Sequence, residues 1–436
     1  MPCAPLRASR TINAPRRSRY RDLKGGVSLT QVLVIGAGPT GIAAALNLAE
    51  RGIFSTIVEK KPGIGGRASE LCCKGVAECV RCDVCLSIDK IDDLVQSDFI
   101  RVLTSTEVVR VSGKPGAFRV TLKRNAQHVR EEACVGCGAC AEVCPVKGSA
   151  IRPCSESGAP RTFHIDEEKC IRLRNGECGK CADVCPTAAI DFSPRVSKKQ
   201  LAVGAIIVAN GYEPFDAAKE PRYGYGLCRD VISSVEVERS ISRTGKILVP
   251  SSGKTPKRIA VIQCVGSRDD RFGASYCSKV CCKYALKIGQ LLKRQDPDAE
   301  ISFFFMDWRP YDLVDDELTG WATREKNIIL IRSRPAEVLD CGSGKPVLRF
   351  ASTDDEKVIE TDFDLVMLSV GILPPRDASD LARSLGLSLS EQGFLEERVP
   401  GVFPAGCCTG PKDIEESVED GIAAAGKVAS FLEGLH

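Results

Sequence analysis

Two runs of closely spaced cysteines constrain this chain of 436 residues more than any other feature. Each run ends in a Cys-Pro pair, at Cys144-Pro145 and at Cys185-Pro186. This is the pattern of a bacterial ferredoxin, in which three closely spaced thiolates hold one corner of a [4Fe–4S] cubane and the cysteine before proline reaches the other cluster. A zinc site seldom uses eight thiolates in this order. The runs therefore predict a module with two [4Fe–4S] clusters.

Crossed ligation divides the eight cysteines into two sets. One cluster is expected on Cys134, Cys137, Cys140 and Cys185. The other is expected on Cys170, Cys178, Cys181 and Cys144. Residues 131–190 contain both sets, differ in composition from their flanks and interrupt an α/β pattern. We therefore expect an inserted ferredoxin-type domain there.

The whole chain has 23 cysteines and only 3 histidines. Secreted disulfide scaffolds are normally short and lack such ligand runs, so thiolate-bound metal in a reducing, cytoplasmic compartment is the better interpretation. A formal charge of +3 favours neither nucleic acid nor an acidic substrate. No apolar run has the length of a bilayer span, so no direct membrane span is expected.

A dinucleotide-binding unit is predicted near the start of the chain. An apolar run at 31–35 leads into Gly36-Ala-Gly38-Pro-Thr-Gly41, which opens a segment with helical spacing, and a second strand ends at Glu59. These glycines let backbone N–H groups approach a pyrophosphate at the helix N-terminus. Glu59 is placed to accept hydrogen bonds from a ribose hydroxyl. Either NAD or FAD would satisfy this pattern.

Further segments favour FAD. Gly65-Gly66-Arg67 follows the second strand, as in many two-dinucleotide-domain flavoproteins, and another buried strand ends in a turn at Gly211. Near the C-terminus, residues 401–406 end in Gly406 and resemble the segment that closes over the flavin ribitol in that superfamily. The superfamily usually has Asp after this glycine, where this chain has Cys407-Cys408. We expect Asp413 to substitute for it.

A second βα unit starts with a strand at 258–263, and the pyridine-nucleotide domain of a related reductase would place its Gly-rich turn directly after this strand. Cys264 stands in place of that turn, and three more cysteines follow within 18 residues, at Cys277, Cys281 and Cys282. Four cysteines are enough to hold a cubane. We therefore predict a [4Fe–4S] cluster where a nicotinamide would otherwise bind.

The run Cys72, Cys79, Cys82 and Cys85 has two interpretations. Its spacing would allow a further cluster. Because it follows Gly65-Gly66, it would equally allow a redox dithiol, Cys82/Cys85, beside the flavin. The residues leave this choice open.

With these residues in hand, the chain resembles the A subunit of heterodisulfide reductase and its homologues. The resemblance rests on the segments above, on 204–215, 223–226 and 410–413, and above all on the spacing of the cysteines in 264–282. It implies that those four cysteines hold a cluster close to FAD in a thioredoxin-reductase-like pair of domains. It also implies electron transfer between flavin, ferredoxin-type clusters and partner subunits, with bifurcation at the flavin in some members. A short form of the family is expected, without the additional cluster domains of longer members.

The expected fold class is α/β, a two-dinucleotide-domain flavoprotein with an inserted two-cluster ferredoxin-type module. We expect the following organisation: a disordered basic arm (1–29), the first segment of the FAD domain (30–130), the ferredoxin insert (131–190), the second segment of the FAD domain with a linker (191–257), a second Rossmann-like domain with a cluster (258–362) and the C-terminal segment of the FAD domain (363–436).

The expected function is that of an FAD- and [4Fe–4S]-containing electron-transfer subunit in a multi-subunit, heterodisulfide-reductase-like oxidoreductase. Its expected partners are other redox subunits, hydrogenase-like proteins or ferredoxins, in a homo- or hetero-oligomer. An alternative is a self-contained NAD(P)H-linked disulfide reductase that uses Cys82/Cys85. A second Gly-x-Gly-x-x-Gly would favour that alternative, and the sequence lacks one. A third possibility is a scaffold whose clusters only stabilise the fold.

Overall fold

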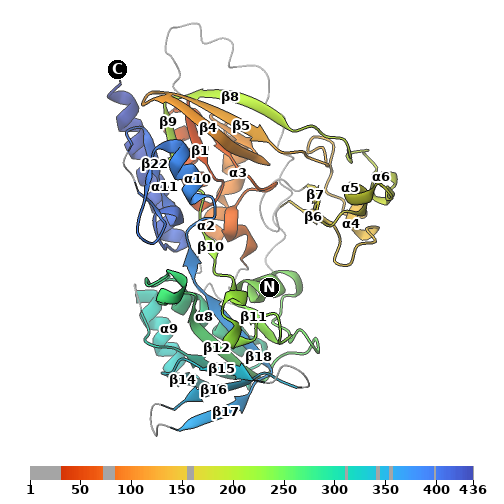
Figure 1. Ribbon diagram of the computed structural model, residues 1–436, viewed down its shortest axis with the longest axis vertical. Coiled ribbons are helices and arrows are strands. Elements are labelled where there is room, and N and C mark those ends of the chain that lie inside the picture. Colours follow the sequence, from red (N-terminus) through yellow and green to blue (C-terminus); the bar gives the residue numbers. More distant parts are fainter. Residues whose placement is uncertain are drawn as a thin grey trace.

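Two lobes stand one above the other in the computed structural model, and a small module projects from the side of the upper lobe (Figure 1). The structure describes residues 31–71, 84–154, 162–309, 313–339, 344–352, 357–396 and 399–435. The expected basic arm and the cysteines Cys72, Cys79 and Cys82 lie outside these residues.

The upper lobe is built on a parallel five-stranded sheet with the order β22-β9-β1-β2-β3. Strands β1, β2 and β9 are buried along their whole length, which explains the continuous apolar sequences of β1 and β9. The five strands are β1 (Val32–Ile35), β2 (Ser55–Val58), β3 (Ile100–Leu103), β9 (Ala205–Val208) and β22 (Val402–Pro404).

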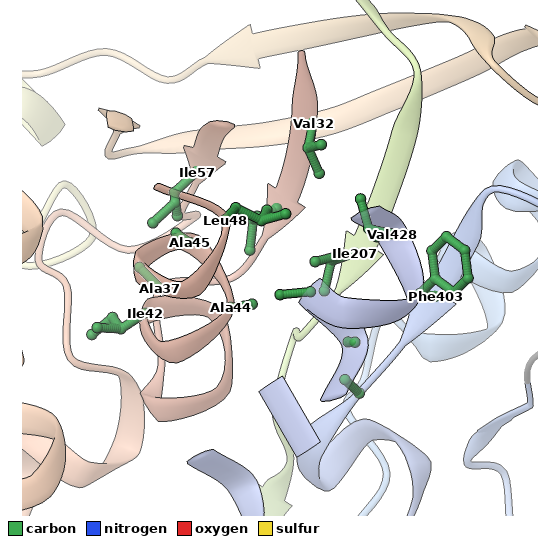
Figure 2. Packing of buried hydrophobic residues seen from close by; sticks show 14 of the residues in the cluster. Val32, Ala37, Ile42, Ala44, Ala45, Leu48, Ile57, Ile207, Phe403 and Val428 are labelled. Carbon is green, nitrogen blue, oxygen red and sulfur yellow. The ribbon is translucent and has the colours of Figure 1, made fainter. Parts of the chain in front are cut away.

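Helices α1 (Pro39–Glu50) and α11 (Ile414–Glu433) pack together against this sheet, and Figure 2 shows the apolar side chains between them. Pro39 occupies the first turn of α1, where a missing N–H costs nothing. The two helices approach closely at Gly421, where a Cβ atom would lie 2.3 Å from the Thr40 carbonyl oxygen. This contact holds the C-terminal helix against the predicted dinucleotide turn.

A hairpin is formed by β4 (Thr106–Lys114) and β5 (Ala117–Arg124). Strand β8 (Ser197–Val203) pairs antiparallel with β5, so a chain that leaves β5 returns directly beside it. The cysteine-rich segment fills this interval, and a bridge between Val129 and Ile190 closes its base. Its elements are α4 (Ala139–Glu142), β6 (Ile151–Pro153), β7 (Phe163–Ile165), α5 (Ile171–Asn175) and α6 (Lys180–Asp183).

The lower lobe contains a second parallel sheet with the order β11-β18-β12-β13-β14. Its strands are β11 (Val231–Ser233), β12 (Arg258–Val265), β13 (Glu300–Phe304), β14 (Ile328–Ile331) and β18 (Leu365–Val370). Its helices are α7 (Ser234–Thr244), α8 (Cys281–Gln295) and α9 (Leu313–Arg324). An antiparallel sheet of β15 (Glu337–Leu339), β16 (Val347–Ala351) and β17 (Val358–Asp362) completes it.

The sheet pairing moves two of the expected domain boundaries. β11 lies before residue 258 and β18 lies after residue 362, yet both pair within the second sheet. A βα pattern along the chain shows where an element begins, but it does not show which strand returns to which sheet. The lobes are linked by β10 (Glu213–Pro214) and β19 (Ile372–Leu373), which pair with each other.

The remaining elements are short. They are α2 (Val84–Ile88), α3 (Lys90–Gln96), α10 (Ala378–Leu385), β20 (Ser388–Leu389), β21 (Leu395–Glu396) and the 3₁₀ helices η1 (Gly66–Glu70), η2 (Ala217–Lys219), η3 (Pro221–Tyr223), η4 (Asp270–Phe272) and η5 (Gly406–Thr409). Within the described ranges, no helix combines the length and apolar character that a membrane crossing requires.

Two glycines in α11 provide a matched test of the helix contact. Gly421→Ala is expected to destabilise the protein by about 1–3 kcal/mol, because the new methyl group overpacks the contact with Thr40. Gly426→Ala, in the same helix, meets no atom within 4 Å and should stabilise it by about 0.5–1 kcal/mol. Urea unfolding of both variants measures the difference, and equal midpoints would contradict the packing argument.

Candidate functional site

A cavity of about 480 Å³ lies between the two lobes and is lined by residues from both. This volume is within the usual range for small-molecule and cofactor sites. Of the residues predicted to bind the cofactor, those that line the cavity are Gly36, Gly38, Glu59, Gly66, Arg67, Gly211 and Asp413. The cavity therefore brings together residues from both ends of the sequence.

One end of the cavity is formed where β1 meets α1. The Glu59 side chain is buried there: its Oε2 accepts a hydrogen bond from the Ala37 N–H at 2.9 Å, and its Oε1 accepts one from the Lys61 N–H at 2.8 Å. A carboxylate has about four acceptor positions, so this fixed group can still accept from ribose hydroxyls. The N-terminus of α1 opens beside it, as pyrophosphate binding requires.

Glycines keep the wall of this cavity close to the backbone. A Cβ atom at Gly36 would lie 2.2 Å from the Ala209 carbonyl oxygen, and one at Gly66 would lie 2.7 Å from the Gly38 Cα. Both residues have positive φ angles, at 103° and 59°. No larger residue fits here, and the resulting narrow cradle suits a dinucleotide backbone.

Three other predicted glycines and Arg67 shape the site by packing and charge. Gly41 and Gly406 stand against Gly36 and Thr40 at distances that leave no room for a side chain, and Gly65 donates its N–H to the Ala37 carbonyl. Arg67 forms an ion pair with Glu213 at 2.5 Å. Its guanidinium is therefore held by the linking strand β10.

The carboxylate beside Gly406 is Asp420, which sequence reasoning missed. Its Oδ2 accepts the Gly406 N–H at 2.7 Å, whereas Asp413 caps the N-terminus of α11 and accepts from the Glu416 N–H at 2.9 Å. Spacing along α11 was the available signal, because Asp413, Ser417 and Asp420 recur at i, i+4 and i+7. Asp413 nevertheless lines the cavity.

The opposite end of the cavity is closed by the second domain. Helix α8 contributes Lys283, Tyr284 and Lys287, and α7 contributes Ser234 and Glu238. The Tyr284 hydroxyl is hydrogen-bonded to the Ser234 hydroxyl at 2.9 Å. The α8 side chains directly follow Cys281-Cys282 at helical spacing, a signal that sequence reasoning did not use.

A buried acceptor in the cavity wall also fits a polar ligand. Asn210 donates from Nδ2 to Asp377 at 2.8 Å, whereas its buried Oδ1 has no partner within the protein. Such an atom is costly unless a donor reaches it. Together with the glycine cradle and Glu59, it indicates that the residues present fit a dinucleotide.

The four cysteines of the 264–282 segment converge where β12 ends and α8 begins. Burial, followed by the charges of Cys264, Cys282 and Cys277, raises the pKa of the Cys281 thiol well above its ordinary value. Cys281 and Cys282 lie in the first turn of α8, where the helix dipole favours thiolates. A bound cation would offset the free-energy cost of burying charged sulfurs, because thiols that coordinate a metal are deprotonated outright.

The backbone is bent to gather these cysteines. Cys264 has a φ angle of 60°, and Arg268 and Lys279 in the same loop have 57° and 62°. Left-handed conformations are uncommon outside glycine, and they cluster at functional sites. In the portion of the chain that the structure describes, no three His, Cys, Asp or Glu side chains are grouped to hold a single metal ion. A four-iron cluster instead takes one thiolate on each iron.

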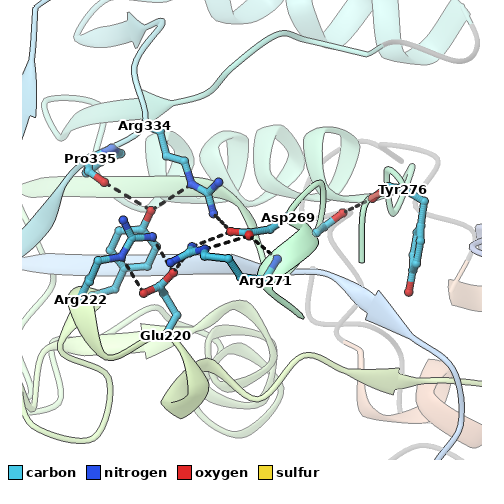
Figure 3. Close-up of polar contacts among 9 residues, drawn as sticks. Glu220, Arg222, Asp269, Arg271, Tyr276, Arg334 and Pro335 are labelled. Carbon is cyan, nitrogen blue, oxygen red and sulfur yellow. Dashed lines mark hydrogen bonds and ion pairs between the residues drawn. The ribbon is translucent and has the colours of Figure 1, made fainter. Parts of the chain in front are cut away.

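A network of ion pairs holds the loop between Cys264 and Cys277 (Figure 3). Asp269 accepts hydrogen bonds from Arg271 at 2.6 Å and from Arg334 at 2.7 Å, and these guanidinium groups keep the pKa of its carboxyl below its ordinary value. The buried Glu220 pairs with Arg222 and Arg271, both at 2.7 Å. The network connects three separate segments around the loop.

The ferredoxin module gathers its cysteines in a way that agrees with crossed ligation. Cys144, Cys170, Cys178 and Cys181 line one small cavity. Burial, and then the neighbouring Cys134 and Cys137, raises the pKa of the Cys140 thiol to about 11.

The two cysteines that precede proline have equivalent surroundings. The Ala150 N–H donates to the Cys144 sulfur at 3.3 Å, and the Ala189 N–H donates to the Cys185 sulfur at 3.2 Å. Backbone donors of this kind stabilise thiolates and tune cluster potentials. These contacts reflect the twofold cysteine pattern of the sequence.

The described residues include only one cysteine of the remaining run, Cys85, which is exposed at the start of α2. The other cysteines of that run are Cys72, Cys79 and Cys82. The choice between a further cluster and a Cys82/Cys85 dithiol therefore stays a prediction.

Comparisons with known proteins agree with this arrangement. Residues 133–189 match a family model described as a 4Fe-4S dicluster domain, and residues 34–88 match one described as an NAD(P)-binding Rossmann-like domain. The A subunit of the H(2):CoB-CoM heterodisulfide,ferredoxin reductase of Methanothermobacter marburgensis is 37% identical over 424 residues. The A 2 iron-sulfur subunit of the CoB–CoM heterodisulfide reductase of Methanopyrus kandleri is 41% identical over 429 residues.

The chain is similar over nearly its whole length to A subunits of heterodisulfide reductases. Both alignments cover 92% of this chain, and they span 63% and 64% of the two relatives. The family resemblance predicted from the cysteine spacing is thereby confirmed.

Solved structures confirm the expected fold class. Thioredoxin reductase from Lactococcus lactis superposes with a TM-score of 0.52 at 14% identity, covering 93% of this chain and 99% of that one. The enzyme from T. acidophilum gives a TM-score of 0.51 at 13% identity, with 93% and 98% covered. At this identity the likeness concerns the fold alone.

Substitution of Asp269 tests directly whether its ion-pair network holds the loop between Cys264 and Cys277. Asp269→Asn should cost about 1–3 kcal/mol, because it removes a charged acceptor from two guanidinium groups. Asp270→Asn, at the exposed neighbouring position, should stay within about 0.5 kcal/mol of wild type. Anaerobic urea unfolding gives both values, and equal effects would show that the network does not hold the loop.

The pH dependence of this difference has a definite sign. The pKa of Asp269 is lower in the folded protein than in the unfolded chain, so its contribution is present above the unfolded pKa of about 3.9 and is lost as the pH falls. The stability gap between wild type and Asp269→Asn should therefore narrow under acid conditions.

Proposed function

We propose that this chain is an FAD- and [4Fe–4S]-containing electron-transfer subunit of a multi-subunit oxidoreductase related to heterodisulfide reductase. The observation that carries the proposal is the position of α8. Its first turn contains Cys281 and Cys282, and its next residues, Lys283, Tyr284 and Lys287, line the dinucleotide cavity. A cluster on these cysteines would lie beside a cofactor in the cavity.

The residues of the cavity assign an orientation to the cofactor. Glu59 would bind the ribose of the adenosine half, and the N-terminus of α1 would bind the pyrophosphate. The other half of FAD would then lie toward α8 and the start of α11, where Lys283 and Asp413 face the cavity. When bound, FAD supplies chemistry that couples two-electron and one-electron transfer.

The ferredoxin module would provide the outlet for electrons. Its clusters would be held by Cys134, Cys137, Cys140 and Cys185 and by Cys144, Cys170, Cys178 and Cys181, and Cys137 is exposed. The word ferredoxin occurs in the names of several relatives, including the M. marburgensis protein. We propose that a ferredoxin-type carrier or another redox protein of the same complex exchanges electrons with this module.

The first experiment is an anaerobic titration of the cluster-loaded protein, followed through flavin and cluster absorbance. Reduction of both cofactors by dithionite or reduced ferredoxin, but not by NADH, is the expected result, because Cys264 stands where a nicotinamide turn would be. Rapid stoichiometric reduction of the flavin by NADH would contradict it and favour the self-contained disulfide reductase.

A cysteine substitution tests the third cluster separately. Cys264→Ser should remove about four irons per flavin, since each cluster holds four and the ferredoxin pair should remain. Cys154→Ser is the control, because Cys154 lies outside every predicted ligand set and accepts a hydrogen bond from Thr162. Iron and acid-labile sulfide are measured per flavin. Full iron content in Cys264→Ser would overturn the assignment.

A further inference from the structure

The cluster loop, residues 276–283, contains the predicted ligands Cys277, Cys281 and Cys282, and three contacts connect it to the FAD domain. The Tyr276 ring packs edge-on against Phe394, with 5.3 Å between ring centroids. Lys279 forms an ion pair with Glu416. Lys283 Nζ lies 3.6 Å from Asp413 Oδ2. All three partners lie between residues 394 and 416, after the chain has crossed back through β19 to the FAD domain.

The two lysines alternate with the predicted cluster ligands. Lys279 lies between Cys277 and Cys281, and Lys283 directly follows Cys282. Their acidic partners form the capping box at the start of α11, and Asp413 also lines the cavity. Each ion pair therefore runs from the cluster loop to the helix end beside the cofactor.

These ion pairs are shielded to some extent from water. The Lys283 side chain is 11% exposed and Asp413 is 26% exposed, whereas Lys279 and Glu416 are 32% and 40% exposed. Burial by itself would raise the pKa of the Glu416 carboxyl. The hydrogen bonds from Lys279 and from the Asp413 N–H, together with the positive charge of Lys279, outweigh burial and lower this pKa. The carboxylate is thus held in its charged form, which the ion pair requires.

Apart from these contacts and the ion pair of Arg239 with Glu70 at 3.0 Å, the connection between the two domains is narrow. The chain crosses between them at β10 and β19, which are two residues each and pair only with each other. Domains joined by narrow links change orientation by default unless their interface prevents it. Charged contacts placed on the cluster loop are well situated to select one orientation.

We infer that Lys279 and Lys283 are positioning residues, which hold the cluster of Cys264, Cys277, Cys281 and Cys282 at a fixed separation from the flavin through Glu416 and Asp413. This inference rests on the proposed function. In the step concerned, one electron leaves the reduced flavin and one oxidised cluster gains it, and no covalent bond is made or broken. Tunnelling between them falls steeply with distance, so the domain orientation sets the rate.

The test uses charge reversal in the full, cluster-loaded chain. The variants are Lys279→Glu, Glu416→Lys and the double variant that restores an ion pair with the charges exchanged. Lys257→Glu is the matched control, because Lys257 pairs with Asp296 at 2.6 Å within the second domain and precedes β12, whose opposite end carries Cys264. Photoreduction of the flavin starts the reaction, and cluster reduction is followed optically. The electron paramagnetic resonance signal of this cluster is the one that Cys264→Ser lacks. Its spin–spin broadening reports the separation between the cluster and the flavin.

Each single reversal should slow flavin-to-cluster transfer about tenfold and weaken the broadening, while flavin and iron contents stay at the wild-type level. A tenfold shift in the domain equilibrium corresponds to about 1.4 kcal/mol, which turning an ion pair into a like-charge contact can supply. The double variant should recover most of the rate, and Lys257→Glu should not change it. Should Lys279→Glu fail to fold, Lys279→Gln takes its place with the same expected direction.

The outcomes separate the two proposals. Unchanged rate and broadening in single variants that retain both cofactors would overturn the positioning role alone. Slow flavin-to-cluster transfer in the double variant would also overturn the positioning role. Loss of the ion pair would then not be the cause of the slow transfer in the single variants. A wild-type protein without flavin, or without iron at Cys264, would overturn the proposed function and the inference with it.

Discussion

Helix α8 serves two sites at once, and the arrangement of both lobes depends on this. Its first turn contains Cys281 and Cys282, two of the predicted cluster ligands, where the helix dipole favours thiolates. The residues that follow, Lys283, Tyr284 and Lys287, line the dinucleotide cavity. Since a helix is rigid over this length, the cluster site and the cavity cannot be moved apart without moving the whole second domain.

The second constraint is the close approach of backbone segments around the cavity. Gly36, Gly66, Gly406 and Gly421 each leave no space for a methyl group. These contacts bring β1, α1, η5 and α11 together, although β1 ends at Ile35 and α11 begins only at Ile414. The cavity wall is thus made by distant ends of the chain that a parallel sheet has brought side by side.

The ferredoxin module is attached in a way that leaves this framework undisturbed. It leaves from β5 and re-enters at β8, which are neighbours in one antiparallel sheet. The insertion therefore costs the FAD domain no strand pairing. Its cysteines supply their own small core together with Val129, Ala150, Ile151 and Ile165, so the module and the dinucleotide domain fold around separate centres.

Local patterns were sufficient for the features that depend on near neighbours in sequence. The ferredoxin cysteines, the β1–α1 turn with Glu59 and the gathering of Cys264 with Cys281 all follow from short spacings, because ligands and turns are set over a few residues. Neither the assignment of β11 and β18 to the second sheet nor the carboxylate of Asp420 beside Gly406 followed from them.

The sequence by itself determined which ligand groups this protein offers: cysteine runs, which predict clusters, and a glycine turn, which predicts a dinucleotide. Only the tertiary structure decided how these sites face one another, through the cavity wall of α7 and α8 and the ion pairs of Lys279 and Lys283. The reason is physical. Ligand spacing is a local covalent property, whereas a contact such as that of Lys279 with Glu416, 137 positions apart, depends on the packing of whole domains.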